Sequence, residues 1–195
     1  MSNYRVWAPY AAEVELLTGD PSAPEHHTMR ACEDGPDGWF EADKAMEVGE
    51  RYAFRLRATA GHGAPQEDDS AESADSAAES GDAAAADPRV GDWTIPLPDP
   101  RSRRQPDGPH GFSEVVDLAE YDWKAADWTG RILPGGLIYE LHVGTYAESG
   151  DFEGVVKRLD HLVDLGVTHV ELMPVQPFGG DRNWGYDGVS WHAVH

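Results

Sequence analysis

From residue 137 the chain reads Leu137-Ile138-Tyr139-Glu140-Leu141-His142-Val143, an apolar run of strand length. A second such run covers residues 167–173. Between them, residues 152–165 follow the helical period of 3.6, which predicts one amphipathic helix. Asp151 stands where an N-cap is needed, and Gly166 stands where a left-handed residue ends a helix. The pattern predicts two parallel strands joined right-handedly by a helix, a βαβ unit.

The loops at the carboxyl ends of these strands are the first places to look for function, because parallel sheets of this kind carry their sites there. Residues 144–150 and 175–187 take those positions. A complete TIM (β/α)8 barrel needs roughly 250 residues, and only about two of its units are recognisable here. We therefore expect an incomplete barrel, the front part of a larger enzyme.

Short strand patterns with Gly, Pro and Asp between them precede this region, at residues 4–7, 14–17, 38–41, 52–56 and 93–95. They predict an N-terminal antiparallel β-sandwich of immunoglobulin-like type. The expected domains are the sandwich at 1–111, a linker at 112–133 and the barrel start at 134–195. Residues 61–91 are rich in Ala, Ser and acidic residues and lack residues to bury, so we predict a disordered acidic loop within the sandwich.

The composition excludes several classes of protein. Thirty-six acidic residues against fifteen basic ones give a net charge of −21, which argues against binding nucleic acid or an anionic membrane. No apolar run reaches the roughly 18 residues of a membrane span. The single cysteine, Cys32, indicates a reducing compartment, and we expect a cytoplasmic protein. The histidines lack partners at metal-ligand spacing, so we expect no metal and no cofactor.

Residues 138–145 and 166–175 resemble the first two barrel strands of the α-amylase superfamily of glycoside hydrolases. Tyr4-Arg5-Val6-Trp7-Ala8-Pro9 is similar to the start of the sandwich that precedes the barrel in those enzymes. Within the superfamily, residues 97–108, 110–117 and 183–188 resemble the malto-oligosyltrehalose trehalohydrolases. The resemblance covers nearly the whole chain except the acidic loop.

The resemblance implies a retaining hydrolysis that releases trehalose from a maltooligosyl trehalose by cleaving the adjacent α-1,4 bond. The family's nucleophile, acid/base and third carboxylate belong to later strands, so we expect them beyond His195 and expect this chain alone to be inactive. A branching enzyme, which is a transglycosylase of the same fold, and a non-catalytic glycan-binding module remain as alternatives. The oligomeric state is open.

The resemblance also points to substrate-binding residues. Tyr186, in the loop after the second strand, is expected to form a platform under the sugar next to the cleaved bond. Its ring offers a flat apolar face and its hydroxyl a hydrogen-bonding group. Trp184 and Asp187 flank it and are weaker candidates. Packing of the loop onto the barrel rim is the alternative for both aromatic residues.

Two further groups of residues leave alternatives open. Glu140 and His142 share a strand face, as do His169 and Glu171, and each pair is either an acid/base pair or, as we favour, part of a polar network. The tryptophans Trp7, Trp39 and Trp93 form either a glycan-binding face on the sandwich or, as we favour, part of its core.

Overall fold

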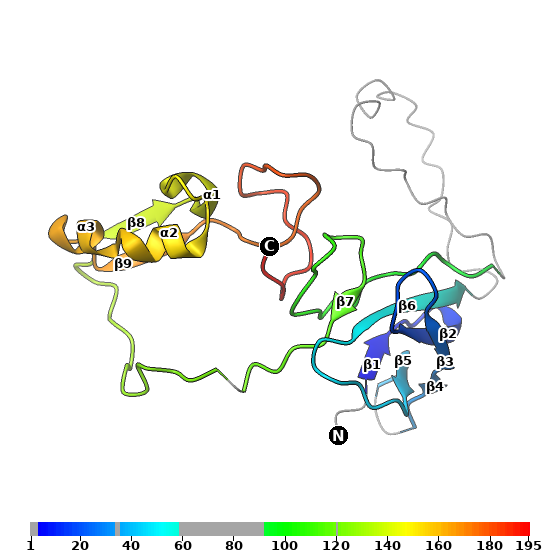
Figure 1. The fold of residues 1–195 in the computed structure, drawn as a ribbon. Coiled ribbons are helices and arrows are strands. Elements are labelled where there is room, and N and C mark those ends of the chain that lie inside the picture. Colours follow the sequence, from blue (N-terminus) through cyan, green and yellow to red (C-terminus); the bar gives the residue numbers. More distant parts are fainter. Residues whose placement is uncertain (1–3, 34–35, 59–91, 120) are drawn as a thin grey trace, which may run out of the picture. The chain divides into compact units, whose positions relative to one another are not determined.

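The computed structural model describes residues 4–33, 36–58, 92–119 and 121–195 (Figure 1). The chain divides into two compact units, one of residues 1–99 with 111–113 and the other of residues 100–110 with 114–195. The predicted acidic loop at 61–91 lies outside the described residues. Across the ranges that are described, no helix has both the length and the apolar character that crossing a membrane requires.

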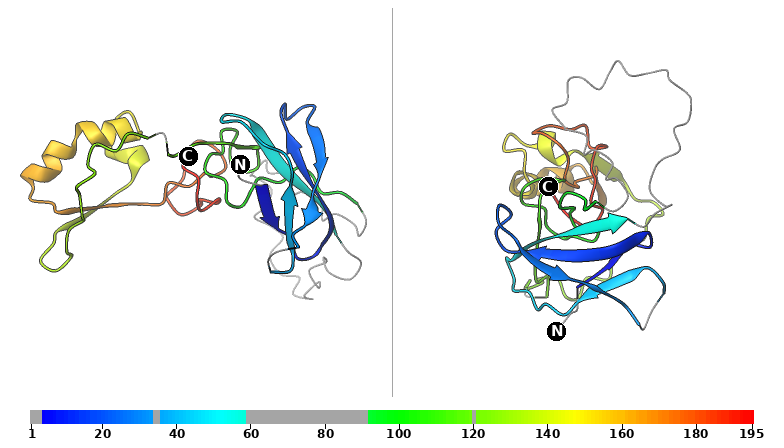
Figure 2. Two further views of the ribbon diagram at one scale, coloured as in Figure 1. Left: turned by 90° about the horizontal axis from the view of Figure 1, so that it is seen from below. Right: turned by 90° about the vertical axis from the view of Figure 1, so that its right-hand side faces the viewer.

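The first unit contains two β-sheets that face each other (Figures 1 and 2). One sheet has the order β1-β5-β4, formed by Tyr4–Trp7, Trp39–Ala42 and Arg30–Ala31. The other has the order β3-β2-β6-β7, formed by Glu25–Thr28, Ala11–Thr18, Arg51–Ala58 and Ser113–Glu114. The pairs β1–β5, β4–β5, β2–β3 and β2–β6 are antiparallel. The structure therefore has the antiparallel β domain expected at its N-terminus.

The core of this unit follows the period of two in its strands. Leu16 on β2 and Phe54 on β6 are register partners, and 0% and 2% of their surfaces are exposed. Tyr52 lies two residues from Phe54 on the same face of β6, with the ring centroids 6.1 Å apart. The ring of Tyr52 also meets that of Tyr4 on β1, at 5.3 Å. This contact joins the two sheets, so the aromatic row forms the centre of the unit.

Pairing resumes after residue 91, as the sequence predicts, but as isolated bridges instead of a strand at 93–95. Trp93 bridges to Arg57, and Leu97 exchanges two backbone hydrogen bonds with Phe54, at 2.7 and 2.8 Å. Pro96 and Pro98 flank Leu97 and have no N–H to donate, which prevents a continuous ladder.

The predicted core position of the three sandwich tryptophans is not observed for all of them. Trp7 is 59% exposed, and Trp39 and Trp93 are only partly buried. Trp93 lies under the guanidinium groups of Arg55 and Arg57, at 4.5 and 5.2 Å from the ring centroid. The core is made by Val, Leu, Phe and Tyr side chains, and the prediction of core packing is wrong for Trp7.

In the second unit, β8 (Ile138–Leu141) and β9 (His169–Leu172) form a parallel pair, with Ile138 opposite His169. The strands are shorter than the predicted runs. Three short helices lie between them: α1 (Val143–Tyr146), α2 (Phe152–Lys157) and α3 (Leu159–Asp164). The predicted N-cap is confirmed, since Asp151 Oδ1 accepts a hydrogen bond from Gly154 N at 2.7 Å. Gly166 ends the helical region with φ +80°.

The single helix expected at 152–165 is interrupted at Arg158, where φ is −111° and ψ is 9°. The N–H of Arg158 bonds to the carbonyl of Val155, three residues back, which tightens the turn. The Arg158 side chain donates to the Tyr146 carbonyl oxygen at 2.7 Å and lies over the Tyr146 ring. These contacts tie Arg158 to α1 instead of leaving it in a straight helix.

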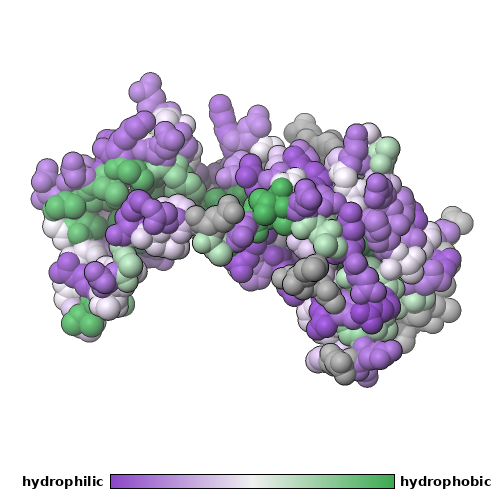
Figure 3. Space-filling view, turned by 60° about the horizontal axis from the view of Figure 1, so that its bottom comes forward, coloured by the Kyte–Doolittle hydropathy of each residue, from purple (hydrophilic) through white to green (hydrophobic). Residues whose placement is uncertain are grey.

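The predicted apolar stripe is wider than the surface that the two strands cover. Val155 and Leu162 pack with Leu141 in one buried cluster. Other members of the stripe stay exposed, with 64% of the surface of Val156 and 70% of that of Val163 accessible. Hydrophobic surface is visible over the second unit, on the left of Figure 3. Packing of the whole stripe onto β8 and β9 is therefore not observed.

Substituting Gly38 with alanine is expected to destabilise the protein more than the same change at Gly49. Both glycines have a left-handed backbone, with φ +88° and +87°. A Cβ on Gly38 would lie 2.7 Å from Pro9 Cα, whereas one on Gly49 would meet nothing within 4 Å. Backbone strain costs Gly49→Ala about 1–2 kcal/mol, and the added clash brings Gly38→Ala to about 3 kcal/mol. Urea unfolding of both variants measures the difference, and equal losses would show that the contact with Pro9 is relaxed.

The outer face of β2 and β6 carries a carboxylate whose titration is expected to affect stability. Glu15 accepts a hydrogen bond from Arg55 Nε at 2.6 Å and lies 2.9 Å from His26 Nδ1. Burial acts to raise the pKa of Glu15, but the bonds from Arg55 and His26 outweigh it and lower that pKa below its ordinary value of 4.5. The stabilisation is therefore present above pH 4.5 and is lost as the pH falls through the lowered pKa.

The Glu15→Gln variant tests this dependence. It should have a lower Tm than the parent protein at pH 7, because the amide carries no charge for Arg55. Its Tm should fall less than that of the parent between pH 7 and acidic pH, because the variant has no carboxylate at this position to protonate. A parallel fall in both proteins would exclude a net contribution from the ionised Glu15.

Candidate functional site

A cavity of about 850 Å³ lies within the second unit, at the carboxyl ends of β8 and β9. Its walls come from the two loops that the sequence singled out, from the start of α2 and from the last described residue. The lining residues are His142–Thr145, Glu148–Phe152, Pro174, Val175, Phe178, Asp181–Trp184 and His195. The position agrees with the rule that parallel strands present their functional loops at this edge.

His142, directly after β8, connects that strand to the loop after β9. Its Nε2 atom lies 3.2 Å from the carbonyl oxygen of Asn183. A carbonyl can only accept a hydrogen bond, so Nε2 carries a proton and donates it to Asn183. His142 Nδ1 is buried and has no hydrogen-bond partner among the described residues. The polar-network interpretation of His142 is therefore supported for one of its two nitrogens.

The turn that follows Asn183 is held by a hydrogen bond between a side chain and the backbone. The Asn183 side-chain oxygen accepts a hydrogen bond from the Gly185 N–H. Gly185 has φ +89°, and a Cβ there would lie 3.0 Å from Met173 Cε and 3.3 Å from His142 Cδ2. Only glycine fits both the conformation and this close approach. Gly185 thus anchors the turn between the two flanking aromatic residues.

The predicted sugar-binding residues occupy this turn but do not all line the cavity. Trp184 is part of the cavity wall and is 84% exposed. Tyr186 is 71% exposed, and Asp187 is also exposed, but neither belongs to the cavity lining. The two rings are thus open to solvent instead of packed against the strands. A stacking platform requires this exposure, and packing of the loop onto a barrel rim stays the alternative.

Three carboxylates line the cavity, at Glu148, Asp151 and Asp181. The pKa of Asp151 is lowered, first by the hydrogen bond from the Gly154 N–H and then by the Ser149 hydroxyl. Asp151 is thus held ionised by its role at the start of α2, which suits a helix cap better than a proton donor. No group of three or more His, Cys, Asp or Glu residues suited to a metal occurs within the described ranges.

Glu140, His169 and Glu171 are the other residues that the sequence offered as members of acid/base pairs. Glu140 is exposed on β8, and its register partner on β9 is Glu171, which is also exposed. His169 Nδ1 lies 2.7 Å from the Thr168 hydroxyl, and its buried Nε2 has no partner among the described residues. No hydrogen bond joins Glu140 to His142 in the described structure. The arrangement gives no support for an acid/base pair on either strand.

Sequence reasoning missed the contribution of the C-terminal residues to this cavity. The rings of Phe178 and His195 stack, with centroids 4.0 Å apart and planes at 24°. The backbone N–H of His195 bonds to the Val175 carbonyl oxygen at 2.8 Å, which brings residue 195 beside the end of β9. A Phe in one loop and a His some residues later carry no spacing signal, so this contact was not recognisable beforehand.

Known proteins resemble this chain over nearly its whole length, although no family model matches it. The malto-oligosyltrehalose trehalohydrolase of Brevibacterium helvolum is 48% identical over 193 residues, which are 98% of this chain and 27% of that protein. The enzyme of the same name from Rhizobium sp. (strain M-11) is 38% identical over 196 residues, 98% of this chain and 26% of the relative. A 1,4-alpha-glucan branching enzyme of Corynebacterium glutamicum is 28% identical over 200 residues, 97% of this chain and 23% of its own.

The chain is also similar to solved structures over nearly its whole length. A putative alpha amylase from Salmonella typhimurium matches with a TM-score of 0.70 and 32% identity, over 99% of this chain and 26% of that one. A pullulanase from Anoxybacillus sp. LM18-11, solved as a complex with maltotetraose, has a TM-score of 0.70 at 21% identity, over 99% of this chain and 28% of its own. This second likeness shows the fold alone. By sequence the chain is similar to malto-oligosyltrehalose trehalohydrolases, and it spans about a quarter of the length of the relatives that it matches.

Proposed function

We propose that this chain is the N-terminal part of an enzyme that hydrolyses a maltooligosyl trehalose and releases trehalose. The observation that carries the proposal is the identity of 48% to a trehalohydrolase over 98% of the chain, against 28% to a branching enzyme. The proposed substrate is an α-glucan chain that ends in trehalose. The chain contributes substrate contacts, and the three carboxylates of the reaction come from other parts of the enzyme.

The parallel pair β8–β9 is, on this proposal, the start of a TIM (β/α)8 barrel. Ile138 on β8 and Val170 and Leu172 on β9 are 47%, 41% and 43% exposed, although they are apolar strand residues. Parallel sheets are normally covered on both faces and continued by further strands. Burying these residues inside a closed barrel removes their apolar surface from water. The predicted domain limits at 1–111, 112–133 and 134–195 belong to the same proposal.

The loop of residues 183–187 supplies the sugar-binding rim. Tyr186 stacks against the sugar next to the cleaved bond, Trp184 extends the aromatic surface, and Asp187 accepts hydrogen bonds from sugar hydroxyls. The exposure of both rings supports this role, because a flat ring buries the C–H face of a sugar at a small entropic cost. The His142–Asn183 hydrogen bond and the tight turn at Gly185 hold the rim in position before substrate arrives.

The chemistry of the proposed reaction is a retaining cleavage. A carboxylate attacks the anomeric carbon while a carboxylic acid protonates the leaving oxygen, and water then hydrolyses the glycosyl intermediate. The role of this chain is to orient the glucan so that the scissile bond lies between those groups. A branching enzyme runs the same first step but transfers the glycosyl group to another glucan. The two functions therefore differ in the acceptor that the site admits.

Product analysis of the protein encoded by the complete gene tests the proposal. The protein is incubated with maltotriosyl trehalose and, separately, with amylose, and the products are identified by chromatography and NMR. Free trehalose and maltotriose from the first substrate, without new α-1,6 linkages in the second, are the expected products. New α-1,6 branches without trehalose would establish a branching enzyme. Binding of both sugars without turnover would leave a glycan-binding module.

A further inference from the structure

The cavity of about 850 Å³ at the carboxyl ends of β8 and β9 is not accounted for by the proposed rim. Tyr186 and Asp187 lie outside its lining, so a sugar on Tyr186 leaves the role of the cavity open. Cavities of about 300–1,000 Å³ are the usual size of small-molecule sites, which combine flat apolar walls with a few polar groups. The lining of this cavity therefore indicates the ligand that it takes.

Trp184 supplies the aromatic part of the wall, on a backbone that is held from both sides. His142 Nε2 donates to the carbonyl oxygen of Asn183, 3.2 Å away. The Asn183 side chain in turn accepts a hydrogen bond from the Gly185 N–H, so the turn closes around Trp184. The indole ring itself is 84% exposed. A flat apolar ring on a fixed backbone suits stacking against the C–H face of a sugar.

Three charged side chains of the lining have unused hydrogen-bonding capacity. Glu148, Asp181 and Arg182 are exposed, and they form no hydrogen bond or ion pair with other described residues. A carboxylate accepts through two oxygens, and a guanidinium donates through five N–H groups. Asp151, the remaining carboxylate of the wall, differs because it caps α2. The cavity thus offers both acceptors and donors to a ligand.

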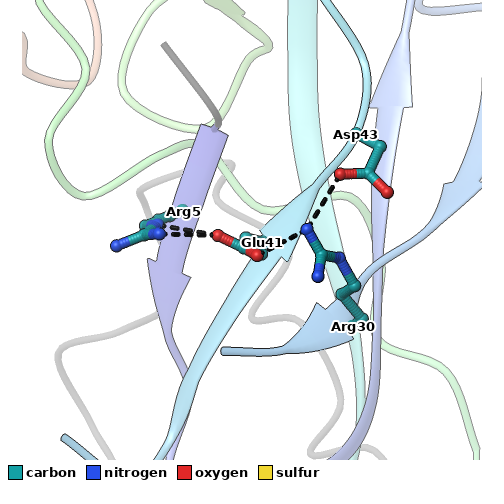
Figure 4. Close-up of polar contacts among 4 residues, drawn as sticks. All are labelled: Arg5, Arg30, Glu41 and Asp43. Carbon is teal, nitrogen blue, oxygen red and sulfur yellow. Dashed lines mark hydrogen bonds and ion pairs between the residues drawn. The ribbon is translucent and has the colours of Figure 1, made fainter. Parts of the chain in front are cut away.

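The charged cluster in Figure 4, on the first unit, shows the opposite arrangement. Glu41 lies 2.7 Å from Nη2 of Arg5 and 2.7 Å from Nη2 of Arg30. Arg30 Nη2 also lies 3.0 Å from Asp43 Oδ1. The Glu41 side chain is only 7% exposed, so these charges hold strands together. The charges around the cavity join no elements in this way, which favours a role in binding.

The signs of the charges around the cavity define the class of ligand. The carboxylates Glu148, Asp151 and Asp181 outnumber the guanidinium of Arg182, so the wall repels anions such as phosphates. Arg182 disfavours an organic cation, and the described ranges hold no metal-binding group of three residues. An uncharged ligand rich in hydroxyls avoids both penalties, because a hydroxyl donates to a carboxylate and accepts from a guanidinium. Carbohydrates combine such hydroxyls with C–H faces that stack on indole.

We propose that the cavity is a second sugar subsite, which binds the glucosyl units that continue from the sugar on Tyr186. Trp184 is its stacking platform, and Glu148, Asp181 and Arg182 are its hydrogen-bonding groups. Trp184 and Tyr186 are two residues apart on one turn, so one oligosaccharide reaches from the rim into the cavity. The identity of the sugar rests on the proposed function. The glucan part and the trehalose part of that substrate share this chemistry, and the experiment distinguishes them.

Titration calorimetry of the complete protein with maltotriose and, separately, with trehalose tests the subsite. The sugar that enters the cavity should bind the parent, and should bind Trp184→Ala and Arg182→Gln about tenfold more weakly. Trp191→Ala, at a tryptophan that is 83% exposed outside the lining, and Arg131→Gln, at an exposed arginine outside it, are the matched controls. Both controls should bind like the parent. Circular dichroism melts establish that each variant is folded.

The kinetics of trehalose release identify the part of the substrate that enters the cavity. If it is the glucan part, Trp184→Ala should lower kcat/KM about tenfold for maltotriosyl trehalose and leave it unchanged for glucosyl trehalose, whose single extra sugar ends at Tyr186. If it is the trehalose part, the variant should slow both substrates alike. Either result supports the subsite, because both depend on Trp184.

The outcomes separate this inference from the proposed function. Unchanged affinities in folded Trp184→Ala and Arg182→Gln, or no binding of either sugar to the parent, would overturn the subsite. Binding that is lost in Tyr186→Ala alone would confine the sugar to the rim and overturn it too. Trehalose release that both cavity variants leave unchanged would refute the subsite and leave the proposed function standing. Sugar binding that depends on Trp184, in a protein that releases no trehalose, would support the subsite and refute the proposed function.

Discussion

The Tyr186→Ala variant of the complete enzyme is expected to release trehalose about a hundredfold more slowly than the parent at subsaturating substrate. The Tyr186 ring is 71% exposed, on a turn that Gly185 and the His142–Asn183 hydrogen bond hold in place. Removing the ring leaves the fold intact, because the side chain packs against little. It removes the surface that we propose orients the sugar next to the scissile bond. The measurement is kcat/KM for trehalose release from maltotriosyl trehalose.

Two control variants define this effect. Tyr186→Phe keeps the ring and should retain at least about a tenth of the activity, since one hydrogen bond is worth about 1 kcal/mol. Trp191→Ala removes an aromatic residue that is 83% exposed but outside the proposed rim, and should leave kcat/KM unchanged. If Tyr186→Ala were as active as the parent, Tyr186 would have no role in positioning the sugar.

The Phe54→Ala variant is expected to lose about 4 kcal/mol of stability, the largest loss from any single truncation proposed here. Phe54 is 2% exposed, faces Leu16 across the β2–β6 pair and lies edge-on to Tyr52. Its backbone also holds Leu97 through two hydrogen bonds. The truncation leaves a cavity in the aromatic row between the two sheets. Urea unfolding followed by tryptophan fluorescence gives the change in free energy.

Of the two controls for Phe54→Ala, one keeps an apolar side chain in the core and the other changes an exposed residue. Phe54→Leu retains most of the volume and should cost about 1.5 kcal/mol. Val48→Ala removes methyl groups from a side chain that is 65% exposed, and should change stability by less than about 0.5 kcal/mol. A loss in Phe54→Ala no larger than that in Val48→Ala would contradict the position of Phe54 at the centre of the first unit.

The strands with clear alternation were predictable from sequence, and those that depend on a neighbour were not. The alternation at 52–56 identified β6, which extends to Arg51–Ala58 in the structure. β3 reads Glu25-His26-His27-Thr28 and has no apolar alternation, because it is an edge strand and three of its four residues are exposed. Its pairing comes from Leu16 and Leu17 of β2, which its own sequence does not reveal.

In the second unit, too, features set by local sequence were predictable, and features that depend on distant contacts were not. The N-cap at Asp151 and the end at Gly166 were recognisable because capping is local chemistry. The break at Arg158 was not, because it depends on contacts with Tyr146, twelve residues earlier in the chain. For the site, the sequence identified both loops that form the cavity. It did not reveal that Trp184 lines the cavity while Tyr186 lies outside its wall.

On the proposed function, residues 183–187 form the sugar-binding rim of an enzyme that releases trehalose. Amide hydrogen exchange of the complete protein, with and without maltotriosyl trehalose, tests it most directly. We expect added substrate to slow exchange at the amides of Trp184, Gly185, Tyr186 and Asp187, and cellopentaose to leave it unchanged. Exchange at these four amides that is unchanged by saturating maltotriosyl trehalose would contradict the claim.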